Sequence, residues 1–267
     1  MDAISAEPLD RRLIDDALGK LASRFALEVR ETCASTSDIA HARLRDGAPS
    51  GCVVVCETQT AGRGRRGRSW LSAPGDSLTF SLLWRFPAGA QPPVGLSLAV
   101  GVAVARALED LGAAGIGLKW PNDILAGGKK VAGILVEAAA EIDAIDYMIV
   151  GIGINVNTPP GIFPADLRGR ATSLAAGFGR PVSRVDVLGD LLERFEREYD
   201  RAGREGFGPV IRRWRELSDM AGRRVRVHSF GRPLEGVITG IGDDGVLLLK
   251  TADGDVERII AGDVEYI

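Results

Sequence analysis

Apolar residues recur every three or four positions in three segments of the chain, and this spacing predicts amphipathic helices. The segments are residues 10–24, 188–199 and 206–217. A further helix is predicted within residues 33–47, where hydroxyl-bearing residues precede the helical spacing and Gly47 follows it. Residues 94–111 are apolar around most of a helical circumference, which is typical of a helix buried in a core.

Runs rich in β-branched residues lie between these helices and predict strands. The runs are residues 26–32, 51–59, 77–86, 116–120, 123–139 and 147–157, and the fifth turns at Gly127 and Gly128. After Met220 the pattern changes to short strands separated by Gly and Asp turns. We therefore predict an α/β domain over residues 1–218, followed by a small β-barrel-like module over residues 219–267.

Composition excludes several classes of protein. The 33 Lys and Arg residues nearly balance the 36 Asp and Glu residues, and 45% of residues are hydrophobic, as in ordinary globular proteins. A disordered or collagen-like chain is therefore excluded, and the charge balance argues against a strongly basic nucleic-acid coat protein. Three cysteines are too few for a disulfide scaffold, and two histidines without CxxC or HExxH argue against a zinc site. No leader peptide pattern is visible, so we expect a cytoplasmic protein.

Residues 60–76 lack apolar periodicity and predict a long basic loop between two core strands. Its four arginines are Arg63, Arg65, Arg66 and Arg68, interleaved with Gly62, Gly64 and Gly67. Glycine lets backbone N–H groups approach an anion, and arginine adds bidentate donors for phosphate or carboxylate. Two interpretations stay open from composition: a lid that orders over an anionic ligand, or a solvated or nucleic-acid-binding basic loop.

Three further segments place polar residues at predicted strand ends. In KWPND, Asn122 could contact a phosphate or a base edge, and Asp123 could hold Mg²⁺ beside substrate phosphates. Lys130 precedes an apolar strand and could meet a carboxylate or a phosphoryl oxygen. Asn155 and Asn157 share one strand face, which suits recognition of a ring such as adenine. Each segment also has a purely structural interpretation, as a turn at a strand end or a surface hairpin.

Together, GRGRRGRSW, KWPNDI, KVAGILVE and GIGINVN resemble the biotin–protein ligase family, over most of the chain from Ser35 onwards. The resemblance implies an α/β (α+β) fold. It has a mixed-sheet, class II synthetase-like catalytic domain over residues 1–218, followed by an SH3-like β-barrel over residues 219–267. The segment before Ser35 is too short for the helix-turn-helix domain of some members. The resemblance therefore implies the single-function class without DNA binding.

The resemblance also implies the residues of two binding sites. Biotin contacts fall on Ser35, Thr36, Ser37, Gln59, Arg63, Gly64, Arg65, Lys130 and Gly133. ATP contacts fall on Arg66, Trp70, Asn122, Asp123 and Asn155, with Asp123 also a contact for Mg²⁺. Lys130 matches the family's essential lysine. Lys130 and Arg65 are the expected catalytic residues. Ser37 stands where the family has asparagine.

The activity that the resemblance implies has two steps. Biotin and MgATP form biotinyl-5'-AMP, and the biotinyl group then passes to a lysine of a biotin carboxyl carrier protein of acetyl-CoA carboxylase or a related carboxylase. Biotin and ATP with Mg²⁺ are substrates, and no tightly bound cofactor is expected. DNA and membranes are not expected as partners, whereas family members differ in whether they form homodimers.

Three other functions compete with this hypothesis. A ligase of the same fold could act on lipoate or another short acid, although the GRGRRG loop together with KWPND favours biotin. A nucleic-acid-binding protein could use residues 62–68, but the near-neutral charge and the absence of interleaved aromatic residues disfavour it. An SH3-like interaction module beside an inactive domain is disfavoured because every charged position named above is retained.

Overall fold

We describe a computed structural model of the protein, which covers residues 7–72, 74–86, 95–141, 144–229 and 233–267. The strands of its first sheet are β1 (Ala26–Cys33), β2 (Cys52–Gln59), β3 (Ser77–Arg85), β4 (Ile116–Lys119), β5 (Asp123–Ala126), β6 (Lys129–Glu141) and β7 (Ala144–Asn155). The strands of its second sheet are β8 (Arg224–His228), β9 (Leu234–Ile241), β10 (Leu247–Lys250), β11 (Val256–Ile259) and β12 (Asp263–Tyr266).

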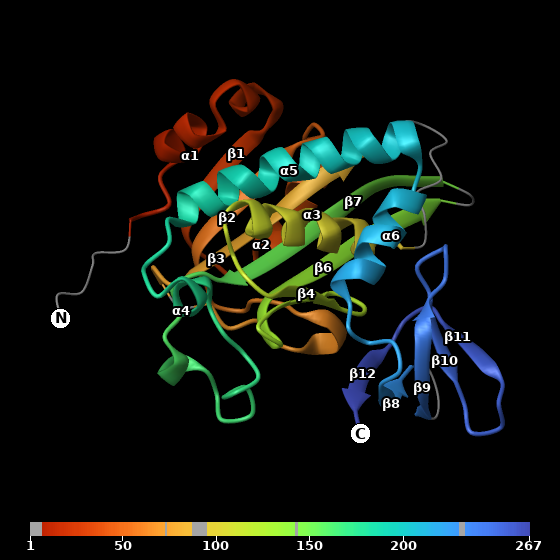
Figure 1. The fold of residues 1–267 in the computed structure, drawn as a ribbon. Coiled ribbons are helices and arrows are strands. Elements are labelled where there is room, and N and C mark those ends of the chain that lie inside the picture. The colour runs from red at the N-terminus through yellow and green to blue at the C-terminus, as the bar shows by residue number, and fades with distance from the viewer. Residues whose placement is uncertain (1–6, 73, 87–94, 142–143, 230–232) are drawn as a thin grey trace.

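Helices connect and cover the strands (Figure 1). The α-helices are α1 (Arg11–Leu18), α2 (Thr36–Arg45), α3 (Leu96–Asp110), α4 (Leu174–Phe178), α5 (Arg184–Glu205) and α6 (Gly208–Leu217). Short 3₁₀ turns occupy Gly19–Arg24, Arg65–Gly67 and Pro160–Ile162.

The first sheet has seven strands in the order β1-β2-β3-β7-β6-β5-β4. It is mixed, because β1 and β2 are parallel while the other neighbours are antiparallel. The second sheet is antiparallel, in the order β11-β10-β9-β8-β12, and lies beyond α6 at one end of the molecule (Figure 1). The predicted fold class, a mixed-sheet α/β domain followed by a small β module, is confirmed.

The two faces of the first sheet are covered unequally. Helices α3 and α5 lie against one face, and the large hydrophobic core forms between them and the sheet. On the other face, α2 packs on β2, β3 and β7 over a much smaller apolar cluster that includes Val54 and Leu83. Helix α2 leaves part of this second face without a helical cover, and the loop after β2 lies there.

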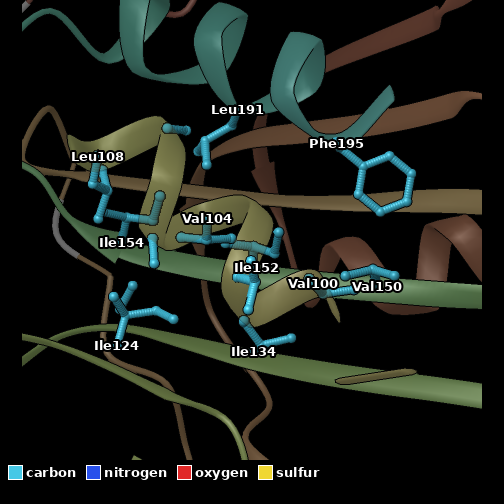
Figure 2. Close-up of a cluster of buried hydrophobic side chains, with 14 of the residues drawn as sticks. Val100, Val104, Leu108, Ile124, Ile134, Val150, Ile152, Ile154, Leu191 and Phe195 are labelled. Carbon is cyan, nitrogen blue, oxygen red and sulfur yellow. The ribbon is translucent and has the colours of Figure 1, made fainter. Parts of the chain in front are cut away.

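Successive side chains of a strand point to opposite faces of the sheet, so alternate residues of β6 and β7 contribute to the large core. Ile134, Ile152 and Ile154 point toward α3, with Val104 and Leu108 of that helix opposite them (Figure 2). These side chains are at most 6% exposed. The predicted core helix over residues 94–111 is confirmed as α3, apart from Val94, which lies outside the described residues.

The first predicted helix is shorter than its apolar pattern suggested. Helix α1 ends at Leu18 because Gly19 adopts a positive φ of 55°, and a 3₁₀ turn replaces the rest of the predicted helix. The short helix α4 had no apolar pattern to predict it. None of the helices in the described part of the chain has the length and apolar character that crossing a bilayer requires.

Truncation in the large core should destabilise the protein strongly. Leu108 is fully buried, so Leu108→Ala should lower the free energy of unfolding by about 2–5 kcal/mol through lost apolar burial and an unfilled cavity. Urea titration followed by circular dichroism measures this change. The exposed Leu167 provides a matched control, and its alanine variant should differ from the wild type by less than about 0.5 kcal/mol. Equal effects at the two positions would contradict this account of the core.

Candidate active site

Part of the sheet face beside α2 has no side chains. Gly133 of β6 lies directly opposite Gly153 of β7, and Gly151 lies two residues earlier on β7. Because alternate strand residues share a face, these three glycines form one bare patch of backbone, which we call the glycine floor. Glycine within a strand often marks a place where another group approaches the backbone closely.

The indole of Trp70 lies on the glycine floor. A Cβ built at Gly153 would come within 2.3 Å of the Trp70 ring, and one at Gly133 within 3.1 Å. Any side chain at position 153 would therefore displace the indole. The indole N–H of Trp70 is buried and has no hydrogen-bond partner among the described residues, a costly state that a bound acceptor would relieve.

Polar side chains line the floor on the side of α2, where the hydroxyls of Thr36, Ser37 and Ser81 are buried and Gln59 is half-buried. The amide oxygen of Gln59 accepts from the backbone N–H of Thr36 at 2.7 Å and lies 3.1 Å from the Thr36 hydroxyl. That hydroxyl contacts Ser81 Oγ at 2.8 Å, which contacts Ser37 Oγ at 3.2 Å. We call Gln59, Thr36, Ser81 and Ser37 the hydroxyl ladder. Ser35, also buried, is the N-cap residue of α2.

Lys130 lies at the other side of the floor. Its Nζ is 2.6 Å from Asp123 Oδ1 and 5.7 Å from the centre of the Trp70 ring. Its backbone N–H donates to the carbonyl of Arg170, and its carbonyl accepts from the N–H of Thr172. The backbone of the lysine is therefore fixed by both strand pairing and a connecting segment, and its ammonium nitrogen lies beside the floor, 3.2 Å from the position of a Cβ built at Gly133.

The KWPND segment joins Lys130 to the arginine-rich loop. Asn122 donates its amide to the carbonyl of Ile134 at 2.7 Å, which ties it to β6. Its amide oxygen accepts from Arg65 Nη1 at 3.3 Å. Burial lowers the pKa of the Arg65 guanidinium, and this effect is opposed by the nearby carboxylate of Asp263. The loop and Lys130 thus meet at the same edge of the floor.

Three loop arginines share one carboxylate of the second sheet. Asp263 Oδ2 is 2.6 Å from Arg68 Nη2 and 3.8 Å from Arg66 Nη1, and its Oδ1 is 3.7 Å from Arg65 Nη1. Three cations facing one anion make a positively charged cluster, which suits a polyanionic ligand such as a triphosphate.

The loop itself is a compact turn. Arg63 and Ser69 form a bridge, and the N–H of Gly64 donates to the carbonyl of Arg68 at 2.7 Å. Within the turn Arg66 adopts a left-handed conformation with a φ of 55°, which is unusual for a residue other than glycine. Its guanidinium reaches the carbonyl of His228 at 2.6 Å, so the second sheet holds the tip of the loop.

Arg63 points away from the other arginines. It pairs with Asp38 of α2 at 3.0 Å and with Glu137 of β6 at 3.4 Å. Gly64 lies with it at the base of the turn. These contacts anchor the start of the loop beside α2.

Lys119 also lies in this cluster, although the sequence suggested no separate role for it. Its Nζ is 4.8 Å from the centre of the Tyr266 ring. Burial lowers the pKa of the Lys119 ammonium, and the nearby Asp123 carboxylate opposes that effect. Lys119 therefore adds positive charge between the KWPND segment and β12.

Asn155 and Asn157 are engaged with the backbone of other segments. Asn155 donates its amide to the carbonyl of Thr172 at 3.1 Å. Asn157, beyond the end of β7, donates to the carbonyl of Val182 and accepts from its N–H. The geometry of Asn157 favours the structural interpretation, a turn-forming asparagine, over recognition of a ring. Asn155 steadies the segment that holds Lys130.

The described residues contain no group of three or more His, Cys, Asp or Glu side chains placed to hold a metal ion. Asp123 and Asn122 nevertheless offer a carboxylate and an amide oxygen, the hard donors that Mg²⁺ accepts beside substrate phosphates. The arrangement fits a metal that arrives with a nucleotide.

Most of the residues predicted from the sequence lie around the floor. Lys130, Gly133 and Trp70 meet on it, the serine and threonine positions line one side, and Arg65 reaches the other through Asn122. The sequence analysis missed Asp263, Ser81 and Gly153. Only Gly153 had a usable signal, its alternation with isoleucine in GIGIN.

Comparisons with known proteins agree with this geometry. Residues 30–155 match the biotin/lipoate A/B protein ligase family, and residues 221–266 match the biotin protein ligase C terminal domain. The chain is 38% identical over 235 residues to the bifunctional ligase/repressor BirA of Bacillus subtilis, covering 88% of this chain and 72% of the relative. It is 35% identical over 268 residues to the biotin–[acetyl-CoA-carboxylase] ligase of Mycobacterium tuberculosis, covering 97% and 96%.

Solved structures are similar over nearly their whole length. The biotin protein ligase from Aquifex aeolicus in complex with biotin and ATP matches with a TM-score of 0.76 and 31% identity, covering 90% of this chain and 97% of that one. The biotin protein ligase from Leishmania major in complex with biotinyl-5-AMP matches with a TM-score of 0.60 and 28% identity, covering 88% and 98%.

Removing the shared carboxylate should loosen the loop. In Asp263→Asn the three guanidinium groups lose their common anion, so trypsin should cut after the loop arginines about tenfold faster. Limited proteolysis of the ligand-free protein, followed by mass spectrometry, measures these rates. Asp253, in an exposed turn of the second sheet, provides the control, and Asp253→Asn should be cut like the wild type. Unchanged cleavage in Asp263→Asn would show that Asp263 does not hold the loop.

Proposed function

Because the chain belongs to the biotin protein ligase family, we propose that it forms biotinyl-5'-AMP from biotin and ATP and transfers the biotinyl group to a carrier protein. The observation that carries this proposal is the convergence of Lys130 and Arg65 at the edge of the glycine floor. The acceptor is a lysine of a biotin carboxyl carrier protein. A relative named for acetyl-CoA carboxylase supports this choice.

The first step activates a carboxylate that is otherwise a poor electrophile. A carboxylate oxygen of biotin attacks the α-phosphorus of MgATP, the bond to the β-phosphate oxygen breaks, and pyrophosphate leaves with that electron pair. The product is a mixed anhydride of biotin and AMP. Two anions must approach each other in this step, so the site has to supply fixed positive charge.

Lys130 and Arg65 supply that charge. Lys130 leaves its ion pair with Asp123 and binds the biotin carboxylate and the α-phosphate. Only its side chain has to move, because its backbone is held by hydrogen bonds on both sides. Arg65 and Arg66 exchange Asp263 for phosphate oxygens. Guanidinium groups bind phosphate in a bidentate manner, which favours the exchange.

The biotin ring lies over the Gly151 end of the glycine floor, beside the Trp70 indole, with its ureido group against the hydroxyl ladder. Ser35, Arg63 and Gly64 complete the set of biotin contacts from the first turn of α2 and the base of the loop. A lipoate ring has no N–H or C=O group to bond with the ladder, so it gains none of the hydrogen bonds that the ureido group makes there. The ladder therefore favours biotin over the related short acid.

ATP lies where the loop, the KWPND segment and β12 meet. Trp70 presents its ring to the adenine, and Asn122 and Asp123 contact phosphate oxygens and the Mg²⁺ that arrives with them. Asn155 acts at this site through the segment that steadies Lys130. Mg²⁺ neutralises phosphate charge when bound.

In the second step the lysine amine of the carrier attacks the acyl carbon of the anhydride. The acyl–oxygen bond breaks, AMP leaves, and the amine loses a proton. Water would hydrolyse the same anhydride, so the loop must cover it until the carrier arrives. We assign activation of biotin to residues 1–218, and to residues 219–267 the support of the loop through Asp263 and His228.

Lys130→Ala should abolish the first step while leaving the fold intact. Removing a preorganised cationic donor costs about 10²–10³ in rate. Biotin-dependent exchange of pyrophosphate into ATP measures this step, and circular dichroism reports the fold. Lys129 is the exposed neighbour in the same hairpin, so Lys129→Ala should retain exchange. Normal exchange in Lys130→Ala would refute the assignment.

Arg65→Gly should let the activated intermediate escape. Without the guanidinium the loop loses its contacts with Asn122 and Asp263, so biotinyl-5'-AMP should leave the site and label lysines of unrelated proteins. Biotinylation of added serum albumin, detected by streptavidin blotting, measures this release. The exposed Arg45, outside the site, provides the control variant Arg45→Gly. Equal albumin labelling by Arg65→Gly and the wild type would count against a covering role for the loop.

A further inference from the structure

Ser81 lies at the centre of the hydroxyl ladder, and the mechanism above gives it no task of its own within the ladder. It is in the middle of β3, opposite Gly151 of β7, and is completely buried. Its hydroxyl lies between those of Thr36 and Ser37, at 2.8 and 3.2 Å. A hydroxyl has one proton, so Ser81 can donate to only one of these two neighbours and must accept from the other.

The far end of the ladder fixes that direction. The backbone N–H of Thr36 donates to Gln59 at 2.7 Å, which identifies the accepting atom as the amide oxygen. The Thr36 hydroxyl lies 3.1 Å from the same oxygen, and two oxygens at this distance are bonded only if the hydroxyl donates. Because a hydroxyl has one proton, Thr36 can only accept from Ser81.

The direction of the hydrogen bond between Thr36 and Ser81 determines the next one, between Ser81 and Ser37. The Ser81 proton goes to Thr36, so Ser81 accepts from Ser37. Ser37 has then used its proton, and its oxygen keeps only lone pairs for a ligand. That oxygen lies at the glycine floor, 3.1 Å from the position of a Cβ built at Gly151. The floor thus meets an oxygen that accepts and does not donate.

We propose that Ser81 is a positioning residue that sets the specificity of the site for a cyclic urea. It acts by holding Ser37 as an acceptor for a ring N–H group. This inference rests on the proposed function, that biotin is the substrate. A urea ring carries N–H donors beside its carbonyl, and one of them can donate to Ser37. A ring with an oxygen in place of that N–H would instead bring its own acceptor against the Ser37 oxygen, so no hydrogen bond would form.

A merely structural role for Ser81 makes a different prediction. If its hydroxyl only filled space and stabilised β3, its loss would weaken binding of all ring analogues alike. If it holds the Ser37 proton inside the ladder, its loss frees Ser37 to rotate and donate. Analogues that need an acceptor and analogues that need a donor would then respond in opposite directions.

Calorimetric titration of the full chain with biotin and with two cyclic carbamate analogues tests the proposal. Each analogue has a ring oxygen in place of one ureido N–H. The wild type should bind biotin at least tenfold more tightly than the carbamate whose oxygen faces Ser37. In Ser81→Ala, biotin affinity should fall about 3- to 10-fold, the value of one neutral hydrogen bond, while the affinity of that carbamate stays equal or rises.

Two further variants make the result decisive. Ser37→Ala removes the acceptor itself and should abolish the preference for biotin. The double variant Ser37→Ala/Ser81→Ala should behave like Ser37→Ala, because both act on one contact. Thr158 is the control, since its buried hydroxyl lies outside the ladder, and Thr158→Val should keep the wild-type preference. If Ser81→Ala does not fold, Ser81→Cys takes its place, because a thiol fills the position but is only a weak hydrogen-bond donor, and an unchanged preference for biotin in that variant overturns the role of Ser81.

The outcomes separate this inference from the proposed function. Biotin binding by the wild type, with loss of preference in Ser81→Ala and Ser37→Ala, supports the inference. Binding by the wild type with an equal loss for biotin and both carbamates in Ser81→Ala overturns the role of Ser81 and leaves the proposed function standing. A wild-type protein that binds no biotin overturns both.

Discussion

The arrangement of the site depends on the contact between the Trp70 indole and the bare backbone of Gly153. An aromatic ring can lie this close to a sheet only where the strand has no side chain, since a Cβ at Gly153 would come within 2.3 Å of the ring. This contact brings the loop after β2 across to β6 and β7. It thereby brings the loop arginines within reach of Lys130, which belongs to a strand far from β2 in the order of the sheet.

The second sheet contributes directly to the site. Asp263 and the carbonyl of His228 hold the loop tip, and Trp120 of the KWPND segment donates its indole N–H to the carbonyl of Gly245. The smaller module therefore touches both segments that line the floor on the side of Lys130. The site is thus assembled from both sheets, and the large hydrophobic core is likewise continuous with the second sheet, where it includes Val225, Val227 and Leu247.

Much of the fold follows from local pattern, because the spacing of apolar residues determines which face of each element is buried. Helix α3 (Leu96–Asp110), which was predicted within residues 94–111, and the hairpin turning at Gly127 are examples. The site was harder to predict. Asp263 lies 195 residues from Arg68, and no local pattern encodes how the second sheet docks. Ser81 occupies a polar position in an apolar strand, and its meaning emerges only when α2 places Thr36 and Ser37 beside it.

The arginine cluster also has a property that acts beyond contact distance. Three guanidinium charges face the single carboxylate of Asp263, so the cluster keeps a surplus of positive charge at the surface. In physiological salt such a field extends about 8 Å into the solvent. A highly charged polyanion is therefore drawn in before it touches the protein, and added salt slows this capture because it screens the field.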